Sequence, residues 1–250
     1  MRSILATLLI LFFAAVFVRA DSPAVQTLQV QVSDLIQDMA QMSARLKLTA
    51  YEAQVRQAQA VYNFHLDRLF DISCLNFSVP ANAARLQDHL DLLMESFCPD
   101  FGTWTAAGPG VANGSVTQIV NVPPSAIGFA ATRATYQGIT AGGVFGCGSQ
   151  HNVINPVVTF SSDSHGRTVG TLTARLWQFA LFGATNTWAD IMGWYDNDWT
   201  LENGQWCMSR FFAANDIIVT RTPGDVNIYA FAQGTDQLPP LPRAVPDYIA

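Results

Sequence analysis

The chain has 250 residues and a mass of 27.2 kDa, half of its residues are hydrophobic, and its formal net charge is −6. This composition excludes an intrinsically disordered protein, and the length suits one large domain with extensions or two small domains. Acidic residues outnumber basic ones by 19 to 13, and Lys47 is the only lysine. Such a surface repels phosphate backbones, so we expect no nucleic-acid partner.

Residues 1–20 have the pattern of a cleaved secretory signal peptide. Arg2 precedes a short apolar run, and Val18 and Ala20 are small residues at the minus-three and minus-one positions. The run is shorter than the roughly 20 residues that a membrane anchor needs. Cleavage after Ala20 would remove Arg2 and Arg19, leaving 11 basic against 19 acidic residues and a net charge near −8. We therefore expect a secreted protein with no membrane attachment after cleavage.

All four cysteines follow this predicted signal peptide: Cys74, Cys98, Cys147 and Cys207. An even number in an exported chain suggests two disulfides, for which three pairings exist. We expect Cys74 to pair with Cys98, stapling two helices, and Cys147 to pair with Cys207, tying sheet elements. Buried free thiols are the alternative. No clustered Cys/His spacing occurs, so we expect no metal site.

Two further motifs concern modification and cofactors. The tripeptides that begin at Asn76 and Asn113 are N-glycosylation sequons and fit a secreted glycoprotein. The sequence contains no GxGxxG, P-loop, HExxH or GxSxG motif. We therefore expect no nucleotide, flavin or metal cofactor.

The segment 21–49 carries apolar residues at alternating spacings of four and three, namely Leu28, Val32, Leu35, Met39, Met42 and Leu46. This spacing is typical of an amphipathic helix or a coiled coil. The pattern covers less than three heptads, so we expect an extra N-terminal helix that packs on its own domain. A dimerisation arm, and hence a homodimer, is the alternative.

Three core helices are expected next. The first is Tyr51 to Phe70, whose inner face would carry Tyr62, His65 and Leu66. The second runs from Ala81 to Phe97 and ends before Pro99, and the third runs from Ser125, as its cap, to Gly138. A strand from Phe101 to Ala107 would point Trp104 to one face, and the residues from Ala107 to Pro124 read as a loop.

The stretch from Gln150 to Phe212 reads as an antiparallel sheet, because apolar and aromatic runs alternate with turn residues. Asn203-Gly204 is the clearest hairpin turn. From Val169 to Phe182 both faces are largely apolar, so both should be covered. In the last strand, alternation places Trp206, Met208, Arg210 and Phe212 on one face and Cys207, Ser209 and Phe211 on the other.

These residues resemble a known family. The matching features are His151 with Asn155 and Pro156, Gly193-x-Tyr195-Asp196, Asn203-Gly204-x-Trp206, Arg210 and, earlier, Tyr62-x-x-x-Leu66-Asp67. Together they resemble the SnoaL-like branch of the NTF2-like superfamily, which includes scytalone dehydratase-like enzymes. The resemblance implies an α+β cone, a strongly curved antiparallel sheet with about three helices on its concave face.

The resemblance also sets the domain boundaries. It covers roughly residues 50–215, between the helical extension 21–49 and a C-terminal extension 216–250. That extension contains a candidate edge strand, Val226 to Ala232, and a Pro-rich tail.

Within this family resemblance, His151 matches a histidine that acts as acid or base, and Asp67 matches the aspartate that orients it. A carboxylate bonded to one ring nitrogen fixes the tautomer of the imidazole and stabilises its cation. The second histidine of the dehydratase-like enzymes is absent, because threonines occupy that strand. The residues expected to line the substrate site are Tyr62, His65, Trp104, Asn155, Thr173, Trp177 and Arg210.

The leading hypothesis is therefore a secreted, cofactor-free dehydratase or isomerase that acts on a small apolar or polycyclic molecule by proton transfer. The alternative is a non-catalytic domain of the same fold, either a small-ligand carrier or a dimeric interaction module. A hollow interior with His151 and Asp67 at its wall would favour catalysis or binding. A filled interior would favour the interaction module.

Overall fold

The structure, a computed structural model, describes residues 23–107, 125–143, 145–182 and 187–221. The chain divides into two compact units, Met1–Ala50 and Tyr51–Ala250. The predicted signal peptide, the loop that leads to Pro124, the edge strand at 226–232 and the Pro-rich tail lie outside the described residues. No helix among the described residues is long and apolar enough to cross a bilayer.

The predicted extension and the first core helix are parts of one helix, α2, which runs from Pro23 to Asp71. This segment contains no glycine, and its only proline stands at the first helical position. Proline is tolerated there because the first amide has no partner within the helix. The sequence therefore has no residue that would end the helix between Thr49 and Tyr51, where we expected two separate elements.

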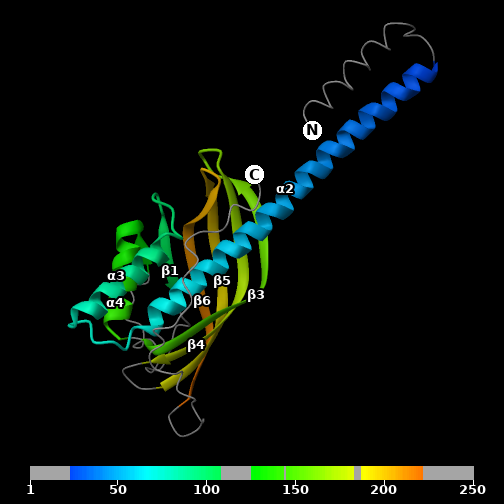
Figure 1. The fold of residues 1–250 in the computed structure, drawn as a ribbon. Helices are drawn as coiled ribbons and strands as arrows, with labels where there is room; N and C mark the ends of the chain where they lie inside the picture. The colour runs from blue at the N-terminus through cyan, green and yellow to red at the C-terminus, as the bar shows by residue number, and fades with distance from the viewer. Residues whose placement is uncertain (1–22, 108–124, 144, 183–186, 222–250) are drawn as a thin grey trace. The chain divides into compact units, whose positions relative to one another are not determined.

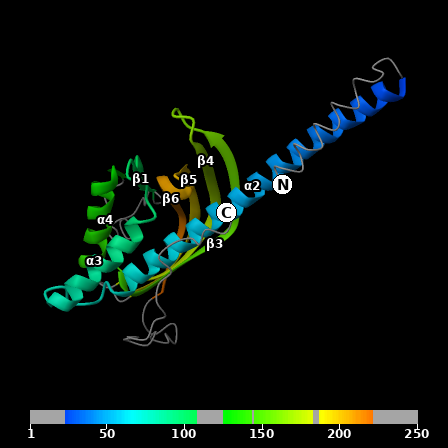
Figure 2. The same cartoon turned by 45° about the horizontal axis from the view of Figure 1, so that its top comes forward.

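Two further helices, α3 (Pro80–Met94) and α4 (Phe129–Ala141), complete the helical layer of the second unit. They lie side by side in both views (Figures 1 and 2), and Arg133 of α4 forms an ion pair with Asp91 of α3 at 2.6 Å. The predicted start of the third helix at Ser125 is wrong. Ser125–Ile127 is a short strand, β2, and the helix begins only after Gly128, whose φ of 84° is not helical.

The second unit is built on one curved, mixed sheet. Its other strands are β1 (Thr103–Ala107), β3 (Phe145–Ser162), β4 (Thr168–Phe182), β5 (Thr187–Glu202) and β6 (Gln205–Arg221), in the order β2-β1-β6-β5-β4-β3. The β1–β6 pair is parallel, and every other pair is antiparallel. The family fold expected from the sequence is therefore present, with one parallel pair added to the antiparallel sheet.

The turn between β5 and β6 has the predicted geometry. Asn203 and Gly204 have φ values of 50° and 85°, and the flanking residues Glu202 and Gln205 pair across the hairpin. Positive φ at both central residues matches the right-handed twist of the strands. The Asn-Gly pair therefore sets the register of the β5–β6 hairpin.

A β-bulge in β6 overturns the predicted alternation. Trp199 pairs with Met208, whereas Asp198 pairs with Arg210, so Ser209 is the extra residue. Met208 is fully buried, and Arg210 points to the opposite face beside Asp198. An inserted residue exchanges the two faces of a strand, so Met208 and Arg210 do not share a face.

The core lies between the helices and one face of the sheet. On β4 this face carries Leu172, Ala174 and Leu176, each at most 4% exposed. Val55 of α2 lies 3.0 Å from the position that a Cβ would occupy on Gly170, so helix and sheet are in close contact. The other face of β4 is not covered among the described residues, because Trp177 remains 38% exposed. The expectation that both faces are covered is therefore wrong.

The expected disulfide pairing is also wrong. Cys98 bonds to Cys207, with a Cα–Cα distance of 4.9 Å. The chain after α3 lies along the start of β6, where the Cys98 amide donates to the Met208 carbonyl at 2.9 Å. This pairing brings Cys98 to Cys207 instead of Cys74. Cys74 is itself disulfide-bonded, and the side chain of Cys147 lies outside the described residues.

Candidate active site

Asp67 of α2 and His151 of β3 form a hydrogen-bonded pair. The Nδ1 atom of His151 lies 2.6 Å from Oδ1 of Asp67, and the backbone amide of His151 donates to both carboxylate oxygens at 3.1 Å. The imidazole is 5% exposed and the carboxylate 21% exposed. The Asp67 carboxylate therefore holds both the imidazole of His151 and the backbone of β3, although the two residues are 84 positions apart in the sequence.

The pairing determines which ring nitrogen can act as a base. An ionised carboxylate only accepts hydrogen bonds, so Nδ1 of His151 must be the protonated nitrogen. In the neutral imidazole Nε2 then carries the lone pair, and within the described part of the chain it makes no hydrogen bond. The Phe70 ring lies 6.0 Å from the imidazole. In this arrangement the Asp67 carboxylate orients the imidazole and would stabilise its cation.

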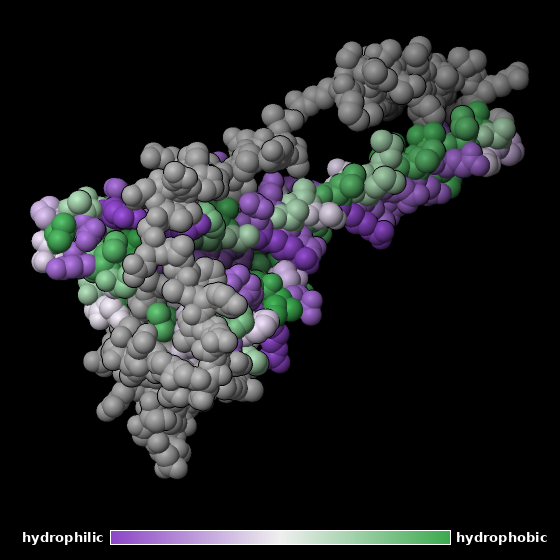
Figure 3. Space-filling view, turned by 60° about the horizontal axis from the view of Figure 1, so that its bottom comes forward, coloured by the Kyte–Doolittle hydropathy of each residue, from purple (hydrophilic) through white to green (hydrophobic). Residues whose placement is uncertain are grey.

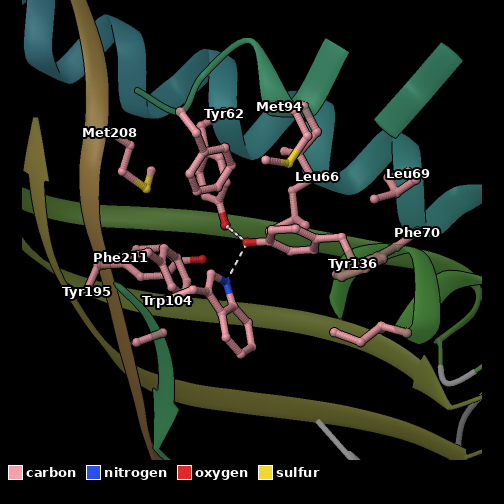
Figure 4. Close-up of a cluster of buried hydrophobic side chains, with 14 of the residues drawn as sticks. Tyr62, Leu66, Leu69, Phe70, Met94, Trp104, Tyr136, Tyr195, Met208 and Phe211 are labelled. Atoms are coloured by element: carbon pink, nitrogen blue, oxygen red, sulfur yellow. Dashed lines mark hydrogen bonds between the residues drawn. The ribbon is translucent and has the colours of Figure 1, made fainter. Parts of the chain in front are cut away.

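A second polar group lies inside the aromatic core (Figure 4). The hydroxyls of Tyr62 and Tyr136 are 2.7 Å apart, and the indole Nε1 of Trp104 donates to the Tyr136 hydroxyl at 2.7 Å. Trp104 also stacks on Phe211, with ring centroids 5.5 Å apart. Polar groups from α2, β1 and α4, which are distant in sequence, therefore meet within the core. We call Tyr62, Trp104 and Tyr136 the tyrosine network.

Burial governs the protonation of this network. It raises the pKa of both Tyr62 and Tyr136, so both hydroxyls keep their protons at neutral pH and can donate hydrogen bonds. The nearby Asp67 charge is a further, smaller cause that raises the pKa of Tyr62 and of Tyr195. The charge of Asp67 therefore acts on the buried tyrosine hydroxyls, although less strongly than burial does.

His65 is buried, but its neighbours differ from those expected of a substrate residue. Its side chain packs at the α3 side of α2, where burial and the nearby imidazole of His89 lower its pKa. The Nδ1 atoms of both histidines are buried without a hydrogen-bond partner among the described residues. The structure therefore groups His65 with His89 of α3.

The structure does not bring four of the expected lining residues to this site. Thr173 and Arg210 bond to Asp196 and Asp198 on the outer face of the sheet, and Trp177 is on that face as well. Asn155 is exposed at a register shift of β3, with a φ of 50°. The alternation of side chains along β4 and the bulge in β6 account for three of these placements.

Tyr136 and Gln178 are the site residues that sequence reasoning missed. Gln178 pairs with His151 across β3 and β4, and its amide donates to the Ser149 hydroxyl at 3.1 Å inside the core. The sequence held only one signal for Tyr136, its place on the same helical face as Ile139. Helical spacing predicts which face of a helix is buried. It does not predict that the Tyr136 hydroxyl bonds to Tyr62, 74 residues earlier, because that contact depends on the whole fold.

Comparison with solved structures finds proteins of similar fold. A provisionally named scytalone dehydratase from Novosphingobium aromaticivorans aligns with a TM-score of 0.47 and 16% identity, over 68% of this chain and 87% of its own. The hexachlorocyclohexane dehydrochlorinase LinA-type3 from Novosphingobium barchaimii aligns with a TM-score of 0.46 and 12% identity, over 78% and 99%. No curated protein matches the chain.

Comparison with family models gives a more direct result. The model of the SnoaL-like domain matches residues 87–211, half of the chain. The match includes His151 and the strands β3 to β5 completely, and α2 with Asp67 precedes it. The chain therefore belongs to the SnoaL-like domain family.

Proposed function

We propose that this protein is a cofactor-independent lyase or isomerase in which His151 transfers a proton and Asp67 orients it. The observation that carries the proposal is the 2.6 Å contact between Nδ1 of His151 and the Asp67 carboxylate, which leaves Nε2 as the basic nitrogen. Positioned general bases of this kind contribute roughly 10²–10⁴ to a reaction rate.

The chemistry that suits this site is abstraction of a proton from carbon. In a dehydration, Nε2 takes the proton, the C–H electron pair forms a double bond, and the adjacent C–O bond breaks. The imidazolium, stabilised by Asp67, then returns the proton to the departing hydroxide, which leaves as water. In an isomerisation the proton is returned to a different carbon, and no group leaves.

The tyrosine network would act on the oxygen of such a substrate. Tyr62 and Tyr136 keep their protons at neutral pH, and one of the two protons forms the hydrogen bond between the hydroxyls. The other proton can be donated to the substrate, and a donor in a water-excluded site stabilises developing negative charge on oxygen. The aromatic rings around them, Trp104, Tyr195 and Phe211, favour a mainly apolar or polycyclic molecule. The residues around the tyrosine network therefore support a substrate of this class.

One observation favours the second candidate, a non-catalytic ligand-binding or interaction module. Tyr62, Tyr136 and Tyr195 are each at most 2% exposed, and their rings contact neighbouring aromatics at centroid distances near 6 Å. Close packing of this kind also stabilises an ordinary core. The two candidates differ in turnover, which can be measured.

The test uses small cyclic molecules that carry a hydroxyl or halide next to an acidic C–H bond. Each is incubated with the protein in D₂O, and mass spectrometry follows loss of the leaving group and uptake of deuterium. With the converted substrate, we expect His151→Ala and Asp67→Asn each to lower kcat/KM about 100-fold or more. The matched control is His165→Ala, because His165 is exposed in the turn between β3 and β4.

Two outcomes would contradict the catalytic proposal. Conversion that survives His151→Ala within about tenfold, with folding intact, would remove His151 from the role of base. Binding of a panel member without conversion or deuterium uptake would instead support the ligand-binding module.

We also propose that the protein is secreted after removal of residues 1–20. The Cys98–Cys207 disulfide supports this proposal, because disulfides persist in oxidising compartments and are rare in reducing ones.

A further inference from the structure

The segment Pro23–Ala50 of α2, taken by itself, exposes a stripe of large apolar side chains. Leu28, Leu35, Met39, Met42 and Leu46 are between 53% and 66% exposed, and together with Val32 we call them the apolar seam. Figure 3 shows apolar side chains gathered along this segment, with hydrophilic ones beside them. A stripe of this size on a soluble helix marks an interaction surface.

The spacing of the seam indicates another helix as its partner. The steps from Leu28 to Leu46 are four, three, four, three and four residues, which is the heptad spacing of a coiled coil. In this register Val32, Met39 and Leu46 occupy the a positions and Leu28, Leu35 and Met42 the d positions. Such a seam is buried when side chains of a second helix with the same spacing interlock with it.

The charges of the segment favour a second protein helix over a lipid surface. Its charged residues are Asp34, Asp38, Arg45 and Lys47, so the segment is electrically neutral. Helices that lie on membranes have a strongly charged polar face rich in lysine and arginine. A second copy of the same chain offers a seam of matching spacing and length without any further partner.

Asp38 and Arg45 indicate the direction in which two copies would pair. Both occupy g positions, which flank the seam. In a parallel pair they would face Ser43 and Ala50 of the other copy, five residues further on, and no ion pair would form. In an antiparallel pair with Met39 opposite Met42, Asp38 of each copy faces Arg45 of the other, and both side chains lean toward each other.

We propose that two copies of this chain associate through their apolar seams as an antiparallel coiled coil with two symmetric Asp38–Arg45 ion pairs. The layers of this arrangement are Val32 with Thr49, Leu35 with Leu46 and Met39 with Met42, each formed twice, and Leu28 lies beyond the outermost layer. The dimer would not depend on the catalytic proposal, because the seam lies within Pro23–Ala50, whereas Asp67, His151 and the tyrosine network all belong to the other unit, Tyr51–Ala250.

The first experiment is sedimentation equilibrium of the purified full-length protein over a range of concentrations. We expect a monomer–dimer equilibrium, and Leu35→Asp should raise the dimer Kd about 100-fold or more, because two buried leucines are lost per dimer. The matched control is Val30→Asp. Val30 is as exposed as Leu35, at 60%, but lies outside the seam, so its Kd should stay within about threefold of the wild type.

The second experiment tests the direction of pairing by charge reversal. Asp38→Arg and Arg45→Asp should each raise Kd about tenfold, and the double variant should return it close to the wild-type value, because the ion pairs are restored with exchanged signs. Circular dichroism checks that each variant keeps its helix.

Each remaining outcome would overturn a stated part of the proposal. A protein that stays monomeric at every concentration, or equal effects of Leu35→Asp and Val30→Asp, would end the proposed interface. Weakened single variants without recovery in the double variant would end the antiparallel arrangement.

Discussion

Asp67 restrains His151 through the ring and through the backbone amide at the same time. Replacing it with asparagine leaves an oxygen that can still accept from the backbone amide, but it removes the charge that stabilises the imidazolium. The Asp67 carboxylate therefore has two roles: it holds the backbone of β3, and its charge stabilises the imidazolium. Asp67→Asn keeps the first role and removes the second. Asp67→Asn should therefore lose activity with little loss of thermal stability.

A second buried histidine should make the stability of the protein depend on pH. Burial, and then the nearby His89, lower the pKa of His65, so the unfolded chain binds a proton more readily than the folded one. This contribution to stability should be full above the unfolded pKa of about 6.5 and should be lost as pH falls through that value toward 5.5. The slope contributed by one proton is at most about 1.4 kcal/mol per pH unit.

Chemical denaturation at several pH values measures this slope. His65→Gln should flatten the profile between pH 7.5 and 5.5, whereas His165→Ala, at an exposed position, should leave it unchanged. Equal slopes in His65→Gln and wild type would show that His65 is not the group responsible.

At this scale the sequence predicted one half of the site. The pairing of His151 with Asp67 could be predicted, because two motif positions of a resembling family specify it. Tyr136 could not, since nothing in the sequence near it differs from an ordinary helical core position. The outward placement of Arg210 could not either, because one inserted residue, Ser209, decides it and leaves no sequence mark.

At the scale of elements, the β5–β6 pair depends on a close approach of two backbones at Gly193. A Cβ on this residue would lie 1.9 Å from the carbonyl oxygen of Ala214, at a register shift between Met192 and Gly193. The collision involves backbone, which cannot rotate away. We expect Gly193→Ala to destabilise the protein by roughly 3 kcal/mol, measured by denaturant unfolding.

A second glycine provides the control for this prediction. Gly138 lies within α4, and a Cβ there would meet nothing within 4 Å. Gly138→Ala should stabilise the protein by about 0.5–1 kcal/mol, because alanine loses less chain entropy in a helix. A Gly193→Ala variant as stable as Gly138→Ala would show that β5 and β6 do not approach as described.

Elements were predicted best where local chemistry decides them. The Asn203-Gly204 turn was correct, since its φ values are a property of those two residues. The third helix was misplaced by four residues at its start, because Ser125 pairs with Thr105 in the sheet and the pairing overrides its preference for a helix cap. The continuous α2 was divided in two, although nothing between Thr49 and Tyr51 ends a helix.

At the scale of the whole molecule, the proposed secretory route predicts a set of covalent features. Asn76 is exposed, and its side-chain oxygen accepts from the Ser78 hydroxyl at 2.7 Å, which leaves the amide nitrogen at the surface. We expect protein secreted from eukaryotic cells to begin at Asp21, to carry a glycan at Asn76 and to contain a Cys98–Cys207 linked peptide.

Mass spectrometry of the non-reduced protein, before and after enzymatic removal of N-glycans, tests these features together. Asn76→Gln should remove the glycan at this site, whereas Ser78→Thr, which keeps the sequon, should retain it and is the control. A secreted chain that retains residues 1–20, or that shows Cys98 linked to Cys74, would contradict the corresponding feature.

The register shift at Asn155 has a consequence for solubility. Among the described strands β3 is the last in the sheet order, so its outer edge could template a strand from another molecule. Between Ile154 and Val157 the ladder is interrupted, Asn155 has a positive φ, and Pro156 has no amide hydrogen to donate. A variant that restores a regular strand here, for example Pro156→Val, should therefore let the edge of β3 pair with other molecules. We expect it to form fibrils at high protein concentration.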